Sequence, residues 1–326
     1  MAGQVLDFEK PILDLEARIE EIEKFSAVES MDLSDELSRL RERLQALQEK
    51  IFTNLTPWQK VQLARHADRP QSTDYVKLML TNFIELRGDR AYRDDGAIIS
   101  GLATIGDRKV MLIGHRRGKH TAERIACNFG SAHPEGYRKA VQKMQLAERF
   151  GLPVVTLIDT MGAYPGIEAE ERGQAQAIAD SLLVMAGLKT PIVATVIGEG
   201  GSGGAIGIGL ADRLLILENA FYSVISPEGC AAILWKDAAK CEEAAMRLKV
   251  TARDLLDLGI ADEIVGEPLG GAHRNHQQMA EKLKEAIGRH LDELSELSKE
   301  EILERRYEKY RKIGFFGGAD SNETQK

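Results

Sequence analysis

The chain has little cysteine, and its cysteines stand far apart. Cys127, Cys230 and Cys241 form no C-x-x-C pair, which excludes a zinc ribbon built by this chain and a disulfide framework. Free thiols are typical of a reducing compartment. The first ten residues are acidic and contain no apolar segment of the kind found in secretion signals. We therefore predict a cytoplasmic protein that holds no metal of its own.

Long apolar runs and an excess of positive charge are also missing. No stretch approaches about 18 uncharged apolar residues, so we expect no membrane-spanning helix and no membrane partner. The net charge of −8 argues against a nucleic-acid-binding protein, which needs a basic surface. With 43% hydrophobic and 29% charged residues among 326, the chain has an ordinary globular composition and enough length for a large core.

The N-terminal part has apolar residues at helical spacing among many charges. This pattern predicts one helix over residues 15–22 and a second that carries a narrow apolar seam over residues 37–51. An antiparallel hairpin of about 50 residues is too small to be stable alone, so we interpret it as a packing or subunit-contact element. Residues 1–72 are predicted as a helical extension with a connector, and residues 73–320 as the main domain.

In the main domain, β-like and helix-like segments alternate. Apolar runs predict strands at 97–105, 109–115, 154–158, 192–197, 214–217 and 221–225. Apolar periodicity and capping residues predict helices at 73–87, 134–150, 172–187, 228–235, 240–248, 251–258 and 275–311. This alternation indicates the α/β class.

Two loops that contain glycine follow consecutive apolar strands. The first loop is Asp159-Thr-Met-Gly-Ala-Tyr-Pro-Gly166, and the second glycine segment is Gly198-Glu-Gly-Gly-Ser-Gly-Gly204. In parallel sheets the carboxyl ends of strands meet at one edge, where ligands bind and helix N-termini gather. Glycine lets the backbone approach a ligand closely. We therefore expect the two loops to lie side by side and to form an oxyanion hole.

The second glycine segment also matches a dinucleotide-binding motif. Gly198, Gly200 and Gly203 fit the pattern G-x-G-x-x-G, and Glu218 follows at about the distance that this motif requires. The helix after the glycines must end before Asp212, however, and is therefore shorter than these proteins normally use.

A serine hydrolase is a further alternative for the same segment. Ser202 is the central residue of a G-x-S-x-G pattern, and Asp262 with His273 or His276 follows in the order of an α/β-hydrolase triad. The histidines stand in a polar segment, where solvent-exposed histidines are the commoner case. A purely structural glycine turn is the remaining alternative.

Two charged clusters are interpreted mainly as solvent-exposed surface. The acidic cluster is Glu168, Glu170, Glu171 and Glu199, and acidic residues are favoured in first helical turns. The basic cluster is Arg116, Arg117, Lys119 and Arg124, for which CoA phosphates or a partner protein are the functional alternatives.

Segments spread over the whole chain resemble one known family. They are residues 88–92, 114–115, 128–130, 134–140, 162–166, 170–174, 196–205, 223–230 and 267–275. Together they resemble the α subunit of the multi-subunit bacterial acetyl-CoA carboxylase carboxyltransferase. The resemblance implies a crotonase-like (ClpP/crotonase) α/β spiral of β-β-α units, with an N-terminal helical hairpin and C-terminal helices.

The resemblance also implies a reaction and partners. The enzyme transfers a carboxyl group from carboxybiotin, held on the biotin carboxyl carrier protein, to acetyl-CoA, giving malonyl-CoA in the first committed step of fatty acid synthesis. Biotin is then not attached covalently to this chain. A zinc-containing β subunit supplies the other half of the active site in an α2β2 heterotetramer, and biotin carboxylase is a further partner. Propionyl-CoA as substrate and a non-catalytic scaffold are the alternatives.

By the same resemblance, the backbone N–H groups of Gly203 and Gly204 are the catalytic donors, and a Cβ at either position should disturb them. The pocket is expected to be lined by Gly162, Ala163, Tyr164, Gly200, Gly201 and Ser202. One position departs from the family pattern, because Met161 stands where proline is usual. Methionine does not fix the backbone as proline does, so the first loop is expected to be less stiff.

Overall fold

The computed structural model describes residues 5–29 and 32–314. Within these ranges, eight strands form one sheet in the order β1-β2-β3-β4-β5-β6-β8, and β7 pairs with the end of β5. They are β1 (Thr81–Glu85), β2 (Ile98–Ile105), β3 (Arg108–His115), β4 (Val154–Thr160), β5 (Ile192–Gly201), β6 (Arg213–Leu217), β7 (Phe221–Ser223) and β8 (Glu263–Val265). The first three strands are antiparallel and the others parallel.

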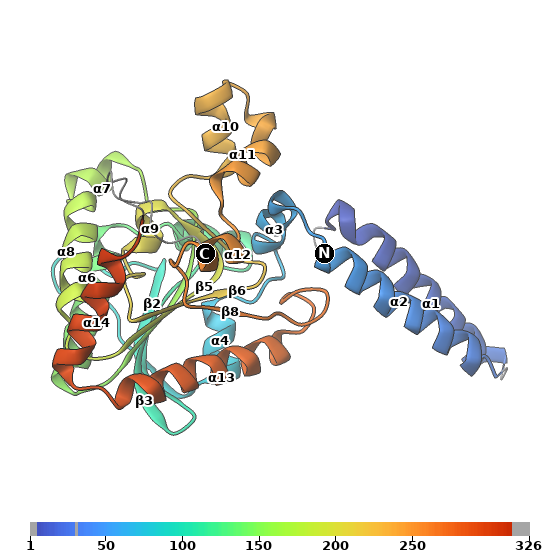
Figure 1. Ribbon diagram of the computed structural model, residues 1–326, viewed down its shortest axis with the longest axis horizontal. Coiled ribbons are helices and arrows are strands. Elements are labelled where there is room, and N and C mark those ends of the chain that lie inside the picture. Colours follow the sequence, from blue (N-terminus) through green and yellow to red (C-terminus); the bar gives the residue numbers. More distant parts are fainter. Residues whose placement is uncertain (1–4, 30–31, 315–326) are drawn as a thin grey trace, which may run out of the picture.

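Helices cover both faces of the sheet (Figure 1). The α-helices before the glycine-containing strand are α1 (Lys10–Glu29), α2 (Ser34–Thr53), α3 (Pro57–Ala64), α4 (Ser72–Met79), α5 (Thr121–Ala126), α6 (Pro134–Arg149), α7 (Ile167–Glu171) and α8 (Gln174–Gly187). Those after it are α9 (Ser202–Ile206), α10 (Pro227–Trp235), α11 (Cys241–Leu248), α12 (Ala252–Asp257), α13 (His276–Ser295) and α14 (Lys299–Arg311). Short 3-10 helices are η1 (Asp7–Glu9), η2 (Asn128–Gly130) and η3 (Ala238–Lys240).

The core lies between the sheet and these helices. Every residue of β4 and β5 is buried, as expected for continuous apolar strands covered on both faces. Helices α6 and α8 lie on one side of the sheet, and α4 and α13 lie on the other (Figure 1). Their buried residues, among them Tyr137, Met144, Met185, Met279 and Leu283, join one core with the strands. Among the described residues, no helix combines the length and apolarity that crossing a bilayer requires.

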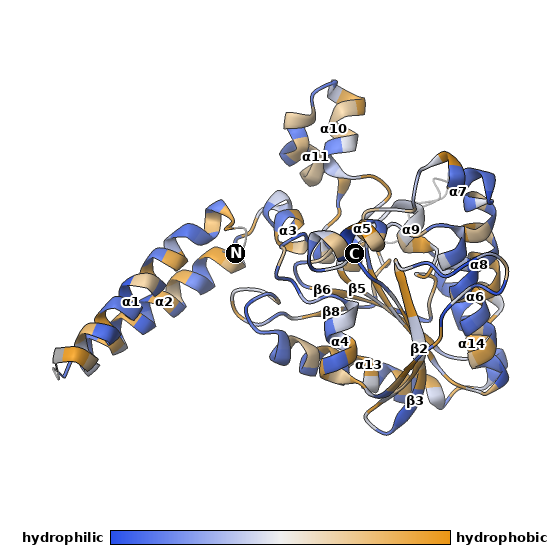
Figure 2. Cartoon of the chain, turned by 180° about the vertical axis from the view of Figure 1, so that it is seen from behind, coloured by the Kyte–Doolittle hydropathy of each residue, from blue (hydrophilic) through white to orange (hydrophobic). Residues whose placement is uncertain are grey.

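The N-terminal hairpin is present as predicted and projects from the body of the molecule (Figure 1). The rings of Phe8 and Phe52 lie 6.2 Å apart, which places the start of α1 beside the end of α2. Figure 2 shows hydrophilic and hydrophobic residues alternating along both helices. Arg274 pairs with Glu16 of α1 at 2.8 Å and thereby joins the hairpin to the body.

The helix predicted over residues 73–87 is wrong beyond Met79. Residues 81–85 form β1 instead, which pairs antiparallel with β2. The partner strand is about 15 residues further on, so a helical pattern read within the segment alone does not include this interaction.

The single helix predicted over residues 275–311 is also wrong, because it is broken between α13 and α14. Ser298 starts α14 with a capping box in which its hydroxyl accepts from the N–H of Glu301 and the Glu301 side chain accepts from the N–H of Ser298. Leu297 packs against the core at the break.

The segment predicted as a connector contains a short helix. In α3, Thr56 and Gln59 form a capping box, and Pro57 occupies the first helical position. Val61 and Ala64 pack in a small cluster with residues of the main domain. The domain boundary at residue 72 stays a prediction.

Candidate active site

The two glycine-containing segments lie at neighbouring strand ends. The first loop (159–166) begins in the last two residues of β4, and the second glycine segment (198–204) lies at the end of β5. Thr160 pairs with Gly200 across the two parallel strands. The predicted juxtaposition is confirmed with one correction: residues 198–201 belong to β5 and not to a loop, because the strand continues and pairs with β7.

The two segments approach so closely that side chains are excluded between them. A Cβ at Gly204 would lie 2.5 Å from the carbonyl carbon of Gly162 and 2.7 Å from the nitrogen of Ala163. A Cβ at Gly201 would lie 2.3 Å from the carbonyl oxygen of Met161. Glycine is therefore required at these two positions by backbone contact.

The neighbouring glycine is less restricted than we predicted. A Cβ at Gly203 would meet only the Cδ1 atom of Ile178, at 3.5 Å, which is an ordinary contact. The expectation that a Cβ distorts the backbone donor is therefore wrong at Gly203, and the expectation that it blocks the approach of a ligand stays a prediction. At Gly200, in contrast, a Cβ would lie 2.7 Å from the ring of Tyr222.

Helix α9 begins directly after the glycine strand. Ser202 is exposed and has a φ of 50°, in the left-handed region that few non-glycine residues adopt. Gly203 is half-buried and Gly204 is buried. Because the first N–H groups of a helix have no acceptor within that helix, Gly203 and Gly204 stay the predicted backbone donors.

The first loop is fixed although it lacks the proline of the family pattern. The Thr160 hydroxyl accepts from the N–H of Gly162 at 3.1 Å and donates to its carbonyl at 2.9 Å. The ring of Tyr164 stacks on His133 with centroids 4.2 Å apart. Met161 itself is about half exposed, at 52%. Neighbouring contacts therefore restrain the loop in place of a proline ring.

A network of charges lies beneath the two segments. Arg117 donates to Asp159 at 3.1 Å and to Glu199 at 3.3 Å. Arg65 pairs with Glu199 at 2.6 Å and with Glu228 of α10 at 2.7 Å. Glu199 is 2% exposed, so its interpretation as a solvated glutamate is wrong. The other members of the acidic cluster, all in α7, are exposed, as predicted.

The predicted basic cluster divides into different environments. Arg117 belongs to the charge network, so its interpretation as a solvent-exposed surface residue is wrong. Lys119 pairs with Asp74 at 2.5 Å, and Arg116 lies 3.9 Å from an acidic side chain of α5. Arg117 and Arg124 line a pocket beside the first loop whose other residues are Ala64, Arg65, His66, Ala67, Arg69, Gln71, Gly118, Phe129 and Asp159.

Two buried groups beside the network have shifted pKa values. Burial raises the pKa of Asp159, although the charge of Arg117 opposes this rise. Burial lowers the pKa of His115 to about 3, which keeps this imidazole neutral. The backbone N–H of Asp159 donates to His115 Nδ1 at 3.4 Å. The neutral ring therefore carries its proton on Nε2.

The alternative motif interpretations do not fit this geometry. His273 bonds Glu9 at 2.9 Å, His276 bonds a backbone carbonyl at 2.7 Å, and Asp262 pairs with a lysine of α14. These downstream residues are therefore engaged elsewhere and do not complete a triad with Ser202. The dinucleotide motif fails too, since its first two glycines lie in β5 and the helix that holds the third, α9, has only five residues.

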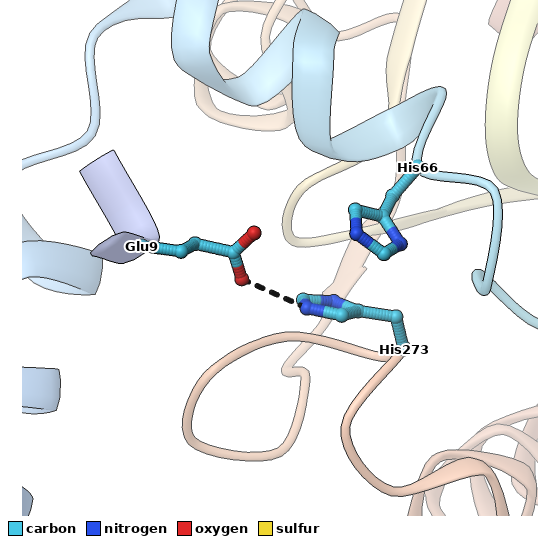
Figure 3. A group of neighbouring side chains, drawn as sticks. All are labelled: Glu9, His66 and His273. Atoms are coloured by element: carbon cyan, nitrogen blue, oxygen red, sulfur yellow. Dashed lines mark hydrogen bonds and ion pairs between the residues drawn. The ribbon is translucent and has the colours of Figure 1, made fainter. Parts of the chain in front are cut away.

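One cluster of described side chains has the composition of a metal site. Figure 3 shows Glu9, His66 and His273 facing one another. The His rings stack with centroids 4.3 Å apart. The N–H of Asp68 donates to His66 Nδ1 at 3.1 Å, so the neutral ring carries its proton on Nε2 and has no free lone pair for a metal. We interpret the cluster as a contact that fastens η1 to the body.

A second such cluster is already neutralised by the protein. The Asp95 carboxylate accepts the backbone N–H of His133 at 2.5 Å. Glu135 pairs with Arg172 at 2.5 Å and with Arg138 at 3.3 Å. The two arginines supply the positive charge that a cation would bring to Glu135, and we assign no metal here.

The fold matches that of solved carboxyltransferase structures. Transcarboxylase 12S, solved with methylmalonyl-coenzyme A and methylmalonic acid bound, superimposes with a TM-score of 0.57 over 70% of this chain, at 16% sequence identity. The chain spans 42% of the length of that protein. The molecule therefore has a crotonase-like α/β fold, and the fold prediction is confirmed.

Sequence comparison defines the family. Residues 5–314 match the family described as acetyl co-enzyme A carboxylase carboxyltransferase-like. Two similar proteins are named acetyl-coenzyme A carboxylase carboxyl transferase subunit alpha. The one from Halalkalibacterium halodurans is 55% identical over 95% of this chain and 96% of its own length. The one from Stenotrophomonas maltophilia is 54% identical over 98% of this chain and 100% of its own length. The chain belongs to the acetyl-CoA carboxylase carboxyltransferase family.

Sequence reasoning missed several residues beside the site. Arg65 stands in the segment predicted as a connector, and His133 precedes a predicted helix without any motif. Neither position carries a local signal. Arg117 belongs to the predicted basic cluster, but its partners are 42 and 82 positions away in the sequence.

Proposed function

We propose that this chain is the α subunit of an acetyl-CoA carboxylase carboxyltransferase. The reaction moves a carboxyl group from carboxybiotin, held on the biotin carboxyl carrier protein, to acetyl-CoA and yields malonyl-CoA for fatty acid synthesis. Near-full-length identity above 50% to proteins of that name supports this assignment. The same relatives favour acetyl-CoA over propionyl-CoA.

The observation that carries the catalytic proposal is the close contact of Gly204 with the backbone of Gly162 and Ala163. This contact fixes the backbone at the start of α9 against a second loop, as an oxyanion hole requires. The catalytic donors are the N–H groups of Gly203 and Gly204. The surrounding pocket is formed by Gly162, Ala163, Tyr164, Gly200, Gly201 and Ser202.

The donors fit the chemistry of biotin. Carboxybiotin, when bound, supplies the carboxyl group and develops negative charge on its ureido oxygen as that group leaves. Two N–H groups held in a partly buried position stabilise such a charge without a reorganisation of solvent. The space beside Gly203 is open enough for a ligand to approach, since even a Cβ would meet nothing closer than 3.5 Å.

No side-chain base is assigned in this chain. The carboxylates nearest to the glycines, Asp159 and Glu199, are held by Arg117 and Arg65. His115 is fully buried and neutral. The contribution of this subunit is therefore the positioning of backbone donors and the exclusion of water from them.

The proposal includes a partner that completes the site. Large apolar side chains are exposed around the strand ends, which is typical of a surface that another protein covers. They include Phe129, Met161, Ile167, Ile206 and Val224. We assign this surface to a zinc-containing β subunit within a cytoplasmic α2β2 heterotetramer that works with biotin carboxylase. Residues 1–72 serve as the extension and residues 73–320 as the transferase domain.

The assay of the separate and combined subunits tests this function. The chain alone is expected to be inactive, and the complex with the β subunit is expected to carboxylate acetyl-CoA and, in reverse, to decarboxylate malonyl-CoA in the presence of free biotin. Propionyl-CoA serves as the competing substrate. A complex that forms but transfers no carboxyl group to either ester would contradict the proposal.

A further inference from the structure

One guanidinium joins the two strand ends that precede the glycine-containing segments. Arg117 Nη1 donates to Asp159 Oδ1 at 3.1 Å and to Glu199 Oε2 at 3.3 Å. The backbone N–H of Glu199 donates to the same Asp159 oxygen, also at 3.1 Å. Asp159 lies near the end of β4 and Glu199 near the end of β5. The bridge therefore spans the two strands whose ends form the site.

The bridge is shielded from water, which strengthens it. The side chain of Glu199 is 3% exposed, that of Asp159 9% and that of Arg117 20%. Without the guanidinium, two carboxylates would face each other in a medium of low dielectric constant. Their repulsion there is much stronger than in water, so the strand ends are expected to separate.

Small movements of these strand ends reach the proposed donors directly. A Cβ at Gly198 would lie only 2.7 Å from Asp159 Oδ1, so the backbone of β5 is already in close contact with the bridge. Thr160 pairs with Gly200 one residue further along both strands. Beyond this pair, Gly204 contacts the first loop.

We propose that Arg117 is a positioning residue for carboxyl transfer, which holds β4 and β5 at the separation that places the Gly203 and Gly204 donors. Arg117 acts through Asp159 and Glu199 and touches no reacting atom. This inference rests on the proposed function, and it adds a residue that the glycine motifs do not contain.

Other charged and titratable groups surround the bridge and define its electrostatic setting. Arg65 holds the second oxygen of Glu199 and connects it to Glu228 of α10. His115 lies against Asp159 from β3. The remaining groups are Tyr75, a buried phenol kept neutral because burial and the charge of Asp159 raise its pKa, and the pocket residues His66, Arg69 and Arg124.

The first experiment compares Arg117→Gln and Arg117→Lys in the assembled complex with the β subunit. A displacement of catalytic groups by about 1 Å costs about 100-fold in rate, and we expect this loss in kcat for Arg117→Gln with little change in KM for the acyl-CoA. Arg117→Lys should lie between, because an ammonium keeps the positive charge and can donate from one nitrogen, as Nη1 does, but it is a more strongly hydrated charge on a flexible stem. Arg108→Gln, which removes an exposed ion pair with Asp292, is the matched control and should retain wild-type kcat.

A pH profile separates positioning from general stability. In Arg117→Gln, Asp159 loses its counter-charge and Glu199 keeps only that of Arg65, so the pKa of Asp159, which burial already raises, rises further and Asp159 takes up a proton at lower pH. That proton restores a hydrogen bond between the strands, and kcat of the variant relative to wild type should rise as the pH falls. The double variant Arg117→Gln/Glu199→Gln should recover activity at high pH, because the new amide at position 199 can donate a hydrogen bond to Asp159 without taking up a proton. A variant-to-wild-type ratio that is independent of pH would contradict the proposal.

Amide hydrogen exchange tests the bridge without relying on activity. In Arg117→Gln, exchange should accelerate in residues 159–164 and 198–204, whereas Arg108→Gln should leave both segments unchanged. If the wild-type complex transfers carboxyl groups and Arg117→Gln has wild-type kcat and exchange, the positioning role is wrong and the function stands. If the wild-type complex is inactive, the function is wrong, and unchanged exchange in Arg117→Gln would overturn the bridge as well.

Discussion

Replacing Gly204 with alanine perturbs the site by a single methyl group. Its carbon would lie 2.5 Å from the carbonyl carbon of Gly162 and 2.7 Å from the nitrogen of Ala163. Non-bonded carbon atoms prefer about 3.5 to 4.0 Å, so the backbone must move by roughly 1 Å at one of the two segments. The variant therefore displaces the proposed donors without changing the identity of any other residue.

The expected loss of activity follows from this displacement. A shift of about 1 Å costs about 100-fold in rate, and complete loss of an oxyanion donor costs about 100- to 1,000-fold. The added methyl is also expected to lower the free energy of unfolding by about 1–3 kcal/mol, as is usual for an overpacked site. We thus expect an assembled complex with kcat lowered at least 100-fold, and Gly204→Val should abolish malonyl-CoA formation.

The assay is malonyl-CoA decarboxylation in the presence of free biotin, measured on complexes that gel filtration shows to be assembled. Gly187→Ala is the matched control, because a Cβ at that glycine meets nothing within 4 Å. Gly203→Ala, whose added methyl fits, should lose less activity than Gly204→Ala. An assembled Gly204→Ala complex with wild-type kcat would refute the reasoning from backbone contact.

Three further predictions concern other parts of the chain. Arg306 is 2% exposed and fully hydrogen-bonded, so Arg306→Met should lower the free energy of unfolding by about 3–5 kcal/mol. The control Arg305→Met, at an exposed neighbouring position, should not lower it. Equal urea midpoints for the two variants would show that the bonds of Arg306 do not stabilise the fold. Burial raises the pKa of Glu267, but Arg69 lowers it by more, so the pKa lies below the usual 4.5. The stability that ionised Glu267 gives the fold is therefore complete above pH 4.5 and is lost as the pH falls through the lowered pKa. Glu267→Gln should make the free energy of unfolding in urea depend less on acid pH, and an unchanged pH dependence would contradict this role of Glu267. A fluorophosphonate probe should leave Ser202 unmodified in mass spectra, and labelling there would revive the hydrolase alternative.

Most of the main sheet could be predicted because its strands are continuous apolar runs. The runs at 154–158 and 192–197 identified β4 and β5, and the turn at 106–107 identified the β2–β3 hairpin. The strand β1 could not be predicted, since its stability comes from pairing with β2. The break before Ser298 depends on a capping box within a long amphipathic pattern, which was read as continuous helix.

The candidate site was predictable only in its glycines. Two loops after consecutive strands have a local pattern, and the parallel arrangement places them together. The network around Arg117 has no such pattern, because Arg65 and Glu199 are 134 positions apart and meet only in the folded chain. Likewise, Gly203 has space for a Cβ and Gly204 does not, and this difference depends on which part of the folded chain lies opposite each residue.

The most direct test of the central claim is an experimental structure of the complex with the β subunit and biotin. The account predicts that the ureido oxygen lies about 2.7–3.1 Å from the backbone nitrogens of Gly203 and Gly204, as expected for oxyanion donors. Biotin bound with its ureido oxygen turned away from α9, in a complex that is active in the crystal, would contradict it.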